Sequence, residues 1–200
     1  AIEGKLRESG RLRHEASHRL TALDALVQAR DWDGLERCIA SWRQAGGSSQ
    51  LRFSEHIAVN AILQDAAGRA ESLGIAFRVS VIVPKALPIL DEDLCALLMN
   101  LLDNALEGAA RTPAEREKFI RFQMRAMDGF LPILCENSFD GHVETDNRGE
   151  LVTTKPDPAS HGFGLAQMRA VAEKYGSVLD VNWTEERFTV QTALQISRET

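Results

Sequence analysis

The 200-residue chain has little of several features that would place it in a specialised class of protein. Its three cysteines, Cys38, Cys95 and Cys135, are odd in number, widely spaced and set among apolar residues. This pattern argues against a disulfide framework or a cysteine-based metal site and predicts reduced core cysteines. No run reaches the roughly 18 apolar residues that a membrane-spanning helix needs. The net charge of −6 argues against nucleic acid as a partner, because binding it requires a basic surface.

A secretory signal peptide and an initiating methionine are also missing, so we expect a fragment of a longer protein. What is present is the composition of a globular chain, with 44% hydrophobic and 26% charged residues. Two hundred residues allow one or two domains. These features predict a cytoplasmic module with a substantial hydrophobic core.

The first part of the chain is predicted to be a helical hairpin. Residues 1–30 carry apolar side chains at helical three- and four-residue spacing. Residues 31–34 interrupt this pattern, and Asp33 is a candidate N-cap for a second helix. Two such helices cannot bury their apolar seam alone, so we expect homodimerisation into a four-helix bundle.

The glycine- and serine-rich residues 46–49 are the best linker candidate and divide the predicted domains, residues 1–48 and residues 49–200. The second domain alternates helical and strand patterns, which predicts an α+β chain ending in an α/β sandwich with a mostly antiparallel sheet. Residues 138–160 are polar and aperiodic, as expected for a lid. The expected helices are residues 55–73, 91–110 and 165–175, and the expected strands are 77–83, 119–127, 130–137, 178–183 and 188–196.

One predicted helix carries polar side chains in a stripe along an otherwise leucine-rich segment. Asn100, Asp103, Asn104 and Glu107 recur at helical spacing and therefore share one face. Burying that much polarity is costly unless it is hydrogen-bonded. A hydrated Mg²⁺ ion carrying phosphates would satisfy it, since Mg²⁺ takes few protein oxygens and keeps several waters. A solvated helix face is the alternative interpretation of the same spacing.

About sixty residues later, Gly162 and Gly164 open another predicted helix. Glycines allow the backbone to approach a ligand closely, and the positive end of a helix dipole favours phosphate. A glycine pair alone is more often an ordinary turn.

Three segments together resemble the sensor histidine kinases, specifically their peptide-sensing (quorum-sensing) subclass. Residues 97–108 resemble the N box, residues 161–176 the glycine box and residues 12–20 the phosphoacceptor box, in the family's order. The resemblance runs from about Leu6 to Ile196. The N box and the glycine box are motifs of the GHKL ATPase superfamily. It implies a dimerisation and phosphoacceptor hairpin followed by a Bergerat-type ATP-binding domain. It also implies ATP and Mg²⁺ as cofactors and a response-regulator receiver domain as partner. A sensor segment before Ala1 would anchor the whole protein in the plasma membrane.

The resemblance also assigns roles in the nucleotide site. Asn104 is expected to coordinate Mg²⁺, Asn100 to contact phosphates and Asp103 to support the metal shell. Gly162 and Gly164 are expected to approach the phosphates, with the helix that starts at Leu165 behind them.

The usual Asp-x-Gly box for adenine is absent, and Asn137 stands in its place. An asparagine oxygen accepts the adenine amino group more weakly than a carboxylate. Asp140, followed by Gly141, is the competing candidate.

In the phosphoacceptor segment, His14 is the expected nucleophile. The adjacent Glu15 can bind its other ring N–H, which fixes the tautomer and raises nucleophilicity. The same residues with His18 also spell the HExxH motif of zinc hydrolases, in which both histidines bind the metal. A third alternative is a phosphotransferase or scaffold whose ATP domain has degenerated.

Overall fold

The computed structural model describes residues 21, 23–34, 52–145, 151–152 and 163–196. The chain divides into two compact units, residues 1–49 and 50–200, which we treat separately. In the first unit, helical residues flank a break at Asp31, whose Oδ1 accepts a hydrogen bond from the Gly34 N–H at 2.8 Å. Asp31 therefore takes the capping role that the sequence suggested for Asp33. The rest of the expected hairpin lies outside the described residues.

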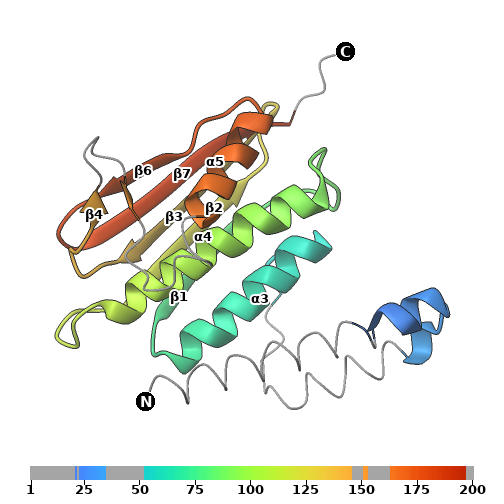
Figure 1. Cartoon of the computed structure of the whole chain (residues 1–200), viewed down its shortest axis with the longest axis horizontal. Helices are drawn as coiled ribbons and strands as arrows, with labels where there is room; N and C mark the ends of the chain where they lie inside the picture. Colours follow the sequence, from blue (N-terminus) through green and yellow to red (C-terminus); the bar gives the residue numbers. More distant parts are fainter. Residues whose placement is uncertain (1–20, 22, 35–51, 146–150, 153–162, 197–200) are drawn as a thin grey trace. The chain divides into compact units, whose positions relative to one another are not determined.

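The second unit is built on a five-stranded mixed sheet in the order β1-β2-β3-β7-β6 (Figure 1). β1 pairs with β2 in parallel, and the remaining pairs are antiparallel. This agrees with the mostly antiparallel sheet expected from the sequence. The strands are β1 (Ala76–Ile82), β2 (Phe119–Arg125), β3 (Phe130–Ser138), β6 (Asp180–Trp183) and β7 (Arg187–Gln195).

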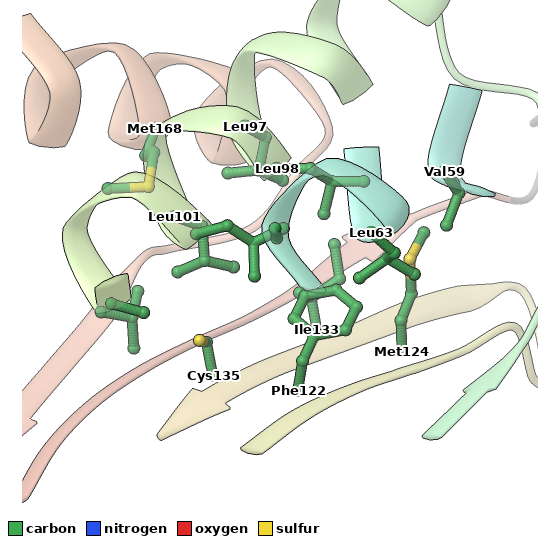
Figure 2. Packing of buried hydrophobic residues seen from close by; sticks show 14 of the residues in the cluster. Val59, Leu63, Leu97, Leu98, Leu101, Phe122, Met124, Ile133, Cys135 and Met168 are labelled. Atoms are coloured by element: carbon green, nitrogen blue, oxygen red, sulfur yellow. The ribbon is translucent and has the colours of Figure 1, made fainter. Parts of the chain in front are cut away.

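Three helices, α3 (Ile57–Ser72), α4 (Asp91–Arg111) and α5 (Phe163–Lys174), cover one face of this sheet (Figure 1). α4 packs between the other two. Alternate strand residues point into the core and meet apolar side chains from all three helices, as Figure 2 shows. Side chains at this interface include Leu63, Leu98, Phe122, Ile133 and Met168, each at most 1% exposed.

Local signals explain where several elements end. Asp128 and Gly129 have positive φ angles of 50° and 79°, which is the two-residue turn expected between β2 and β3. Gly74 and Gly176 follow α3 and α5 with φ angles of 66° and 63°, in the left-handed region that favours glycine. The hairpin and both helix ends are therefore confirmed.

Two expectations need correction. Leu90, not Asp91, is the N-cap of α4, and it makes no side-chain capping bond; Asp91 begins the acidic first turn, where negative charge suits the helix dipole. Within the polar segment, Glu144–Thr145 (β4) and Leu151–Val152 (β5) form a small antiparallel sheet. This pairing was not expected, because two-residue strands leave no detectable periodicity.

The cysteines in the described part of the chain are free. Cys135 is buried on β3, and burial raises the pKa of its thiol to about 12. Cys95 is half-buried on α4, and Cys38 lies outside the described residues. Among the described helices, none combines the length and the apolar character needed to cross a bilayer.

Candidate functional site

The middle of α4 lies against the start of α5, so the polar stripe and the glycine segment are close in space. A Cβ atom added at Gly164 would lie 3.1 Å from Oδ1 of Asn100. This is tighter than an ordinary van der Waals contact, so a residue with a side chain would crowd the asparagine. The glycine at this position keeps that oxygen uncovered on the side that faces α5.

The Asn100 side chain is held in one orientation by two acceptors. Its Nδ2 donates to the Ala96 carbonyl oxygen at 2.7 Å and to Oε1 of Gln167, on α5, at 3.0 Å. A backbone carbonyl can only accept, so the amide nitrogen must face Ala96. The oxygen is therefore the group that Asn100 presents toward Gly164.

Asn104 lies one turn further along α4 and is half-buried. Among the described residues, none makes a hydrogen bond to its amide, so both its oxygen and its N–H groups remain available to a ligand.

Its neighbour Asp103 behaves differently. An oxygen of Asp103 accepts a hydrogen bond from Arg69 on α3, so this carboxylate links two helices. The metal-shell role of Asp103 stays a prediction from the resemblance.

Asn137 lies at the end of β3, beneath Gly108 of α4. It is 3% exposed, and its Nδ2 donates to the Ser138 carbonyl oxygen at 2.8 Å. A Cβ added at Gly108 would lie only 2.6 Å from that nitrogen. The glycine in the helix therefore makes room for the asparagine. Because an amide nitrogen only donates, the Asn137 oxygen is the atom that can accept from an incoming donor.

The competing residue, Asp140, is already engaged. Its Oδ2 lies 3.4 Å from Nε of Arg111, and its Oδ1 accepts from the His142 N–H at 3.1 Å. These contacts tie the loop after β3 to the last turn of α4. Of the two residues considered for adenine, Asn137 is the one whose acceptor is less committed.

A second cluster fastens the N-terminal end of α4 to the C-terminal end of α5. Oδ2 of Asp93 accepts from Nζ of Lys174 and from the Tyr175 hydroxyl, each at 2.7 Å. The Tyr175 hydroxyl also accepts from the Leu90 N–H at 3.0 Å. The hydrogen bond from Lys174, followed by that from Tyr175, lowers the pKa of Asp93. We call these four residues the helix clasp.

Several residues predicted from the sequence lie outside the described part of the chain. They are His14, Glu15, His18, His161 and Gly162. Leu165 is described; it is partly buried and packs against the core, so it anchors the start of α5. No group of three or more His, Cys, Asp or Glu side chains within the described residues is arranged to hold a metal ion. The HExxH segment, residues 14–18, lies outside the described residues.

Sequence reasoning missed Gln167 and Gly108. Gln167 lies three residues after Gly164, on the same face of the first turns of α5, so its spacing was a usable signal. Gly108 stands inside a strongly helical pattern, where glycine costs stability, but Gly68 stands in such a pattern as well, so the sequence alone did not single out Gly108.

A hollow of about 790 Å³ lies elsewhere, on the sheet face that the helices do not cover. It contains none of the α4 or α5 residues described above. The lining includes Ser80, Gln123, Arg125, Leu134 and Gln191 from alternate positions of the strands.

The donor set around α4 suits a magnesium nucleotide. Asn100 and Asn104 supply neutral amide oxygens, which Mg²⁺ accepts while keeping several of its waters. Gly164 belongs to the first turn of α5, where unpaired backbone N–H groups favour phosphate. The residues present therefore fit the cofactors expected from the sequence.

Comparisons with known proteins agree with this fit. A family profile described as the GHKL domain matches residues 90–195, which is more than half of the chain. That stretch includes α4, β3 and α5. No curated protein is significantly similar in sequence.

Solved structures of histidine kinases share the fold. The catalytic domain of histidine kinase ThkA matches with a TM-score of 0.53 and 16% identity, over 70% of this chain and 93% of that one. Histidine kinase AdeS of Acinetobacter baumannii matches with a TM-score of 0.51 and 13% identity, over 92% and 98%. A histidine kinase from Burkholderia phymatum gives 0.51 and 13%, over 87% and 86%.

At these identities the structural similarity concerns the fold, whereas the profile match identifies the family. A GHKL ATPase domain implies nucleotide binding, typically with Mg²⁺. The chain belongs to the GHKL domain family.

Proposed function

We propose that the chain is the cytoplasmic kinase portion of a two-component sensor, which uses ATP and Mg²⁺ to phosphorylate its own histidine. The main support is the approach of Gly164 to the Asn100 oxygen, which brings the two polar signals of the sequence to one place on a GHKL fold. Phosphoryl transfer depends mainly on positioning and charge neutralisation, and this place offers both.

Each element around α4 has a distinct role in this proposal. The amide oxygen of Asn104 would hold Mg²⁺, which neutralises phosphate charge when it is bound, and Asn100, which the resemblance assigns to the phosphates, lies one turn before it on α4. The first turn of α5, with Gly162 and Gly164, would bind the phosphates through backbone N–H groups. Asn137 would accept a hydrogen bond from the adenine amino group through its oxygen, while its nitrogen donates to the Ser138 carbonyl.

The phosphoacceptor in this proposal is His14, with Glu15 holding its ring. A bond would form between an imidazole nitrogen and the γ-phosphorus while the bond to the β-phosphate oxygen breaks, which releases ADP. The phosphoryl group would then pass to an aspartate of a response-regulator receiver domain. Residues 1–48 would pair in a homodimer, and residues 49–200 would form the ATP-binding domain. We assign the protein to the peptide-sensing subclass, with a membrane sensor outside this sequence.

The direct test is labelling with γ-³²P-ATP and Mg²⁺. We expect acid-labile, alkali-stable label on the wild-type chain, its loss in His14→Gln and its retention in His18→Gln. Label that survives His14→Gln and disappears in His18→Gln would move the phosphoacceptor to the neighbouring histidine. Label that survives both substitutions would reject this segment as the acceptor.

Calorimetry separates the kinase from the degenerate-domain alternative. A phosphotransferase or scaffold would not bind ATP with Mg²⁺, whereas the kinase should bind it and lose binding in Asn104→Ala. The zinc hydrolase predicts stoichiometric zinc in the purified protein, which metal analysis would detect.

A further inference from the structure

Gln167 lies within the glycine-box segment, but the resemblance gives it no role, although it makes a direct side-chain contact with the site. It lies on α5, three residues after Gly164, and its Oε1 accepts from Nδ2 of Asn100 at 3.0 Å. The two residues are 67 positions apart in the sequence, so this bond connects the two helices at the level of the proposed site.

The geometry around Asn100 explains why that bond matters. The Ala96 carbonyl oxygen takes one N–H of the amide at 2.7 Å, and Gln167 takes the other. Both donors are then used inside the protein. The remaining polar atom, Oδ1, faces Gly164, where a Cβ would approach to 3.1 Å.

Without an acceptor at position 167, one N–H of Asn100 would lose its partner. The amide could then rotate away from Ala96 or turn this N–H toward a phosphate or water. An amide that donates to phosphate cannot at the same time offer the oxygen that Mg²⁺ prefers. The acceptor on α5 therefore decides which end of the Asn100 amide the ligand meets.

We propose that Gln167 is a positioning residue that fixes the Asn100 amide with its oxygen toward the space beside Gly164. Asn100 then serves as an oxygen donor for the magnesium ion or its waters. This replaces the direct phosphate contact that the resemblance implies for Asn100, because both of its N–H groups are used inside the protein. This inference rests on the proposed nucleotide-binding function, and it assigns Gln167 no contact with the nucleotide.

Gln167→Met tests the proposal because methionine has nearly the same size and offers only a weak acceptor. Gln167→Glu keeps the acceptor. Gln123→Met is the matched control, since Gln123 is an exposed glutamine on β2, on the sheet face away from the helices.

The first measurement needs no nucleotide. In ligand-free protein, the two side-chain amide protons of Asn100 are assigned by NMR from their disappearance in Asn100→Asp. We expect one of them to move upfield and exchange faster in Gln167→Met, and to keep near its wild-type shift in Gln167→Glu. Unchanged signals in Gln167→Met would overturn the hydrogen bond on which the proposal stands.

The second measurement is the ratio of ADP affinities with Mg²⁺ and with EDTA. Gln167→Met should lower this ratio about three- to tenfold, the usual worth of one hydrogen bond. Affinity in EDTA should stay within about twofold, because only the oxygen offered to the metal is disturbed. Gln167→Glu should recover most of the ratio, and Gln123→Met should match wild type.

The outcomes are distinct. Equal losses with and without Mg²⁺ would indicate a merely structural role for Gln167 and overturn the proposal, as would an unchanged ratio. A Gln167→Glu variant as impaired as Gln167→Met would reject the acceptor account. If the wild-type chain binds no ADP in either condition, the nucleotide function fails and the positioning role falls with it. The NMR result would still decide whether the Gln167–Asn100 bond exists.

Discussion

α3 and α4 lie side by side on the same sheet face, yet they use the same residue types for different ends. In α3, the Asn60 oxygen accepts from the backbone N–H groups of Phe53 and Ser54, at 2.9 and 3.3 Å, and so fixes the start of the helix. In α4, Asn104 has no hydrogen-bond partner among the described residues. Asn60 therefore has a structural role, whereas the Asn104 amide has no competing partner in the described part of the chain.

Their glycines differ in the same way. A Cβ added at Gly68 of α3 meets nothing within 4 Å, whereas one added at Gly108 of α4 would lie 2.6 Å from Asn137. Glycine weakens any helix interior, so each costs stability relative to alanine. Only the glycine in α4 has a neighbour that requires it. Residues that are poor for stability but specific in placement are expected at functional sites.

Asn104→Ala should give the largest effect on function. Removing a ligand oxygen should weaken Mg²⁺-nucleotide binding by at least the roughly 10- to 100-fold typical of lost metal-site partners. The free energy of unfolding should stay the same or rise slightly, because alanine favours helix and no hydrogen bond to the described residues is lost.

Calorimetry and urea denaturation measure the two quantities. Asn60→Ala is the matched control and should show the reverse, a loss of about 1 kcal/mol of stability with unchanged nucleotide affinity. Equal changes in stability and nucleotide affinity in Asn104→Ala and Asn60→Ala would show that the two asparagines do not have different roles.

Gly108→Ala should give the next largest effect. The methyl group must displace the Asn137 amide from its bond to Ser138, which costs about 1–3 kcal/mol and offsets the gain of about 1 kcal/mol from helix propensity. Adenine nucleotide affinity should fall together with discrimination against GTP. Gly68→Ala has free space and should stabilise the protein by about 0.5–1 kcal/mol without changing affinity. Stabilisation by both substitutions, with affinity intact, would show that Asn137 does not need the glycine.

Asp93→Asn tests the helix clasp at the other end of α4. Loss of the charge should cost about 1 kcal/mol at neutral pH, because hydrogen bonds to a charged acceptor are stronger than those to a neutral one. The pKa of Asp93 is lowered in the folded state by its hydrogen bonds from Lys174 and Tyr175. Its contribution to stability is therefore present above the unfolded value near 3.9 and disappears as the pH falls through the lower folded pKa.

Urea denaturation between pH 7 and pH 2 follows this change. The difference between wild type and Asp93→Asn should be constant down to about pH 4 and shrink below it. Tyr175→Phe, which removes a hydroxyl and keeps the carboxylate, should lose about 1 kcal/mol with little dependence on pH above pH 4. A wild-type minus Asp93→Asn difference that persists at pH 2 would exclude the carboxylate charge as its source.

The parts of the fold that the sequence predicted are those with local causes. Glycines at helix ends and the Asp128–Gly129 turn carry their geometry in one or two residues, so element positions were correct to within a few residues. β1 and β2 pair in parallel although α4 separates them in the sequence. The residue pattern of either strand does not predict this pairing. The sheet order was therefore beyond reach.

For the site, the helical spacing of the polar residues placed Asn100, Asp103 and Asn104 on one helix face. It could not separate their roles. The partner of Asp103 is 34 positions away and the Lys174 partner of Asp93 is 81 positions away. Such pairings depend on how the helices pack against each other. Residue spacing within one helix gives no information about that packing.

The smallest effect is expected for Asp103→Ala, which removes the ion pair between Asp103 of α4 and Arg69 of α3. Asp103 and Arg69 are 46% and 47% exposed in their side chains, so water and salt screen the pair. We expect a loss of at most about 1 kcal/mol, matched by Arg69→Ala and not doubled in the double variant. Mg²⁺-nucleotide affinity should stay within about twofold of wild type. A strong loss of affinity in Asp103→Ala but not in Arg69→Ala would show that this carboxylate serves the metal, as the resemblance to the histidine kinases implies.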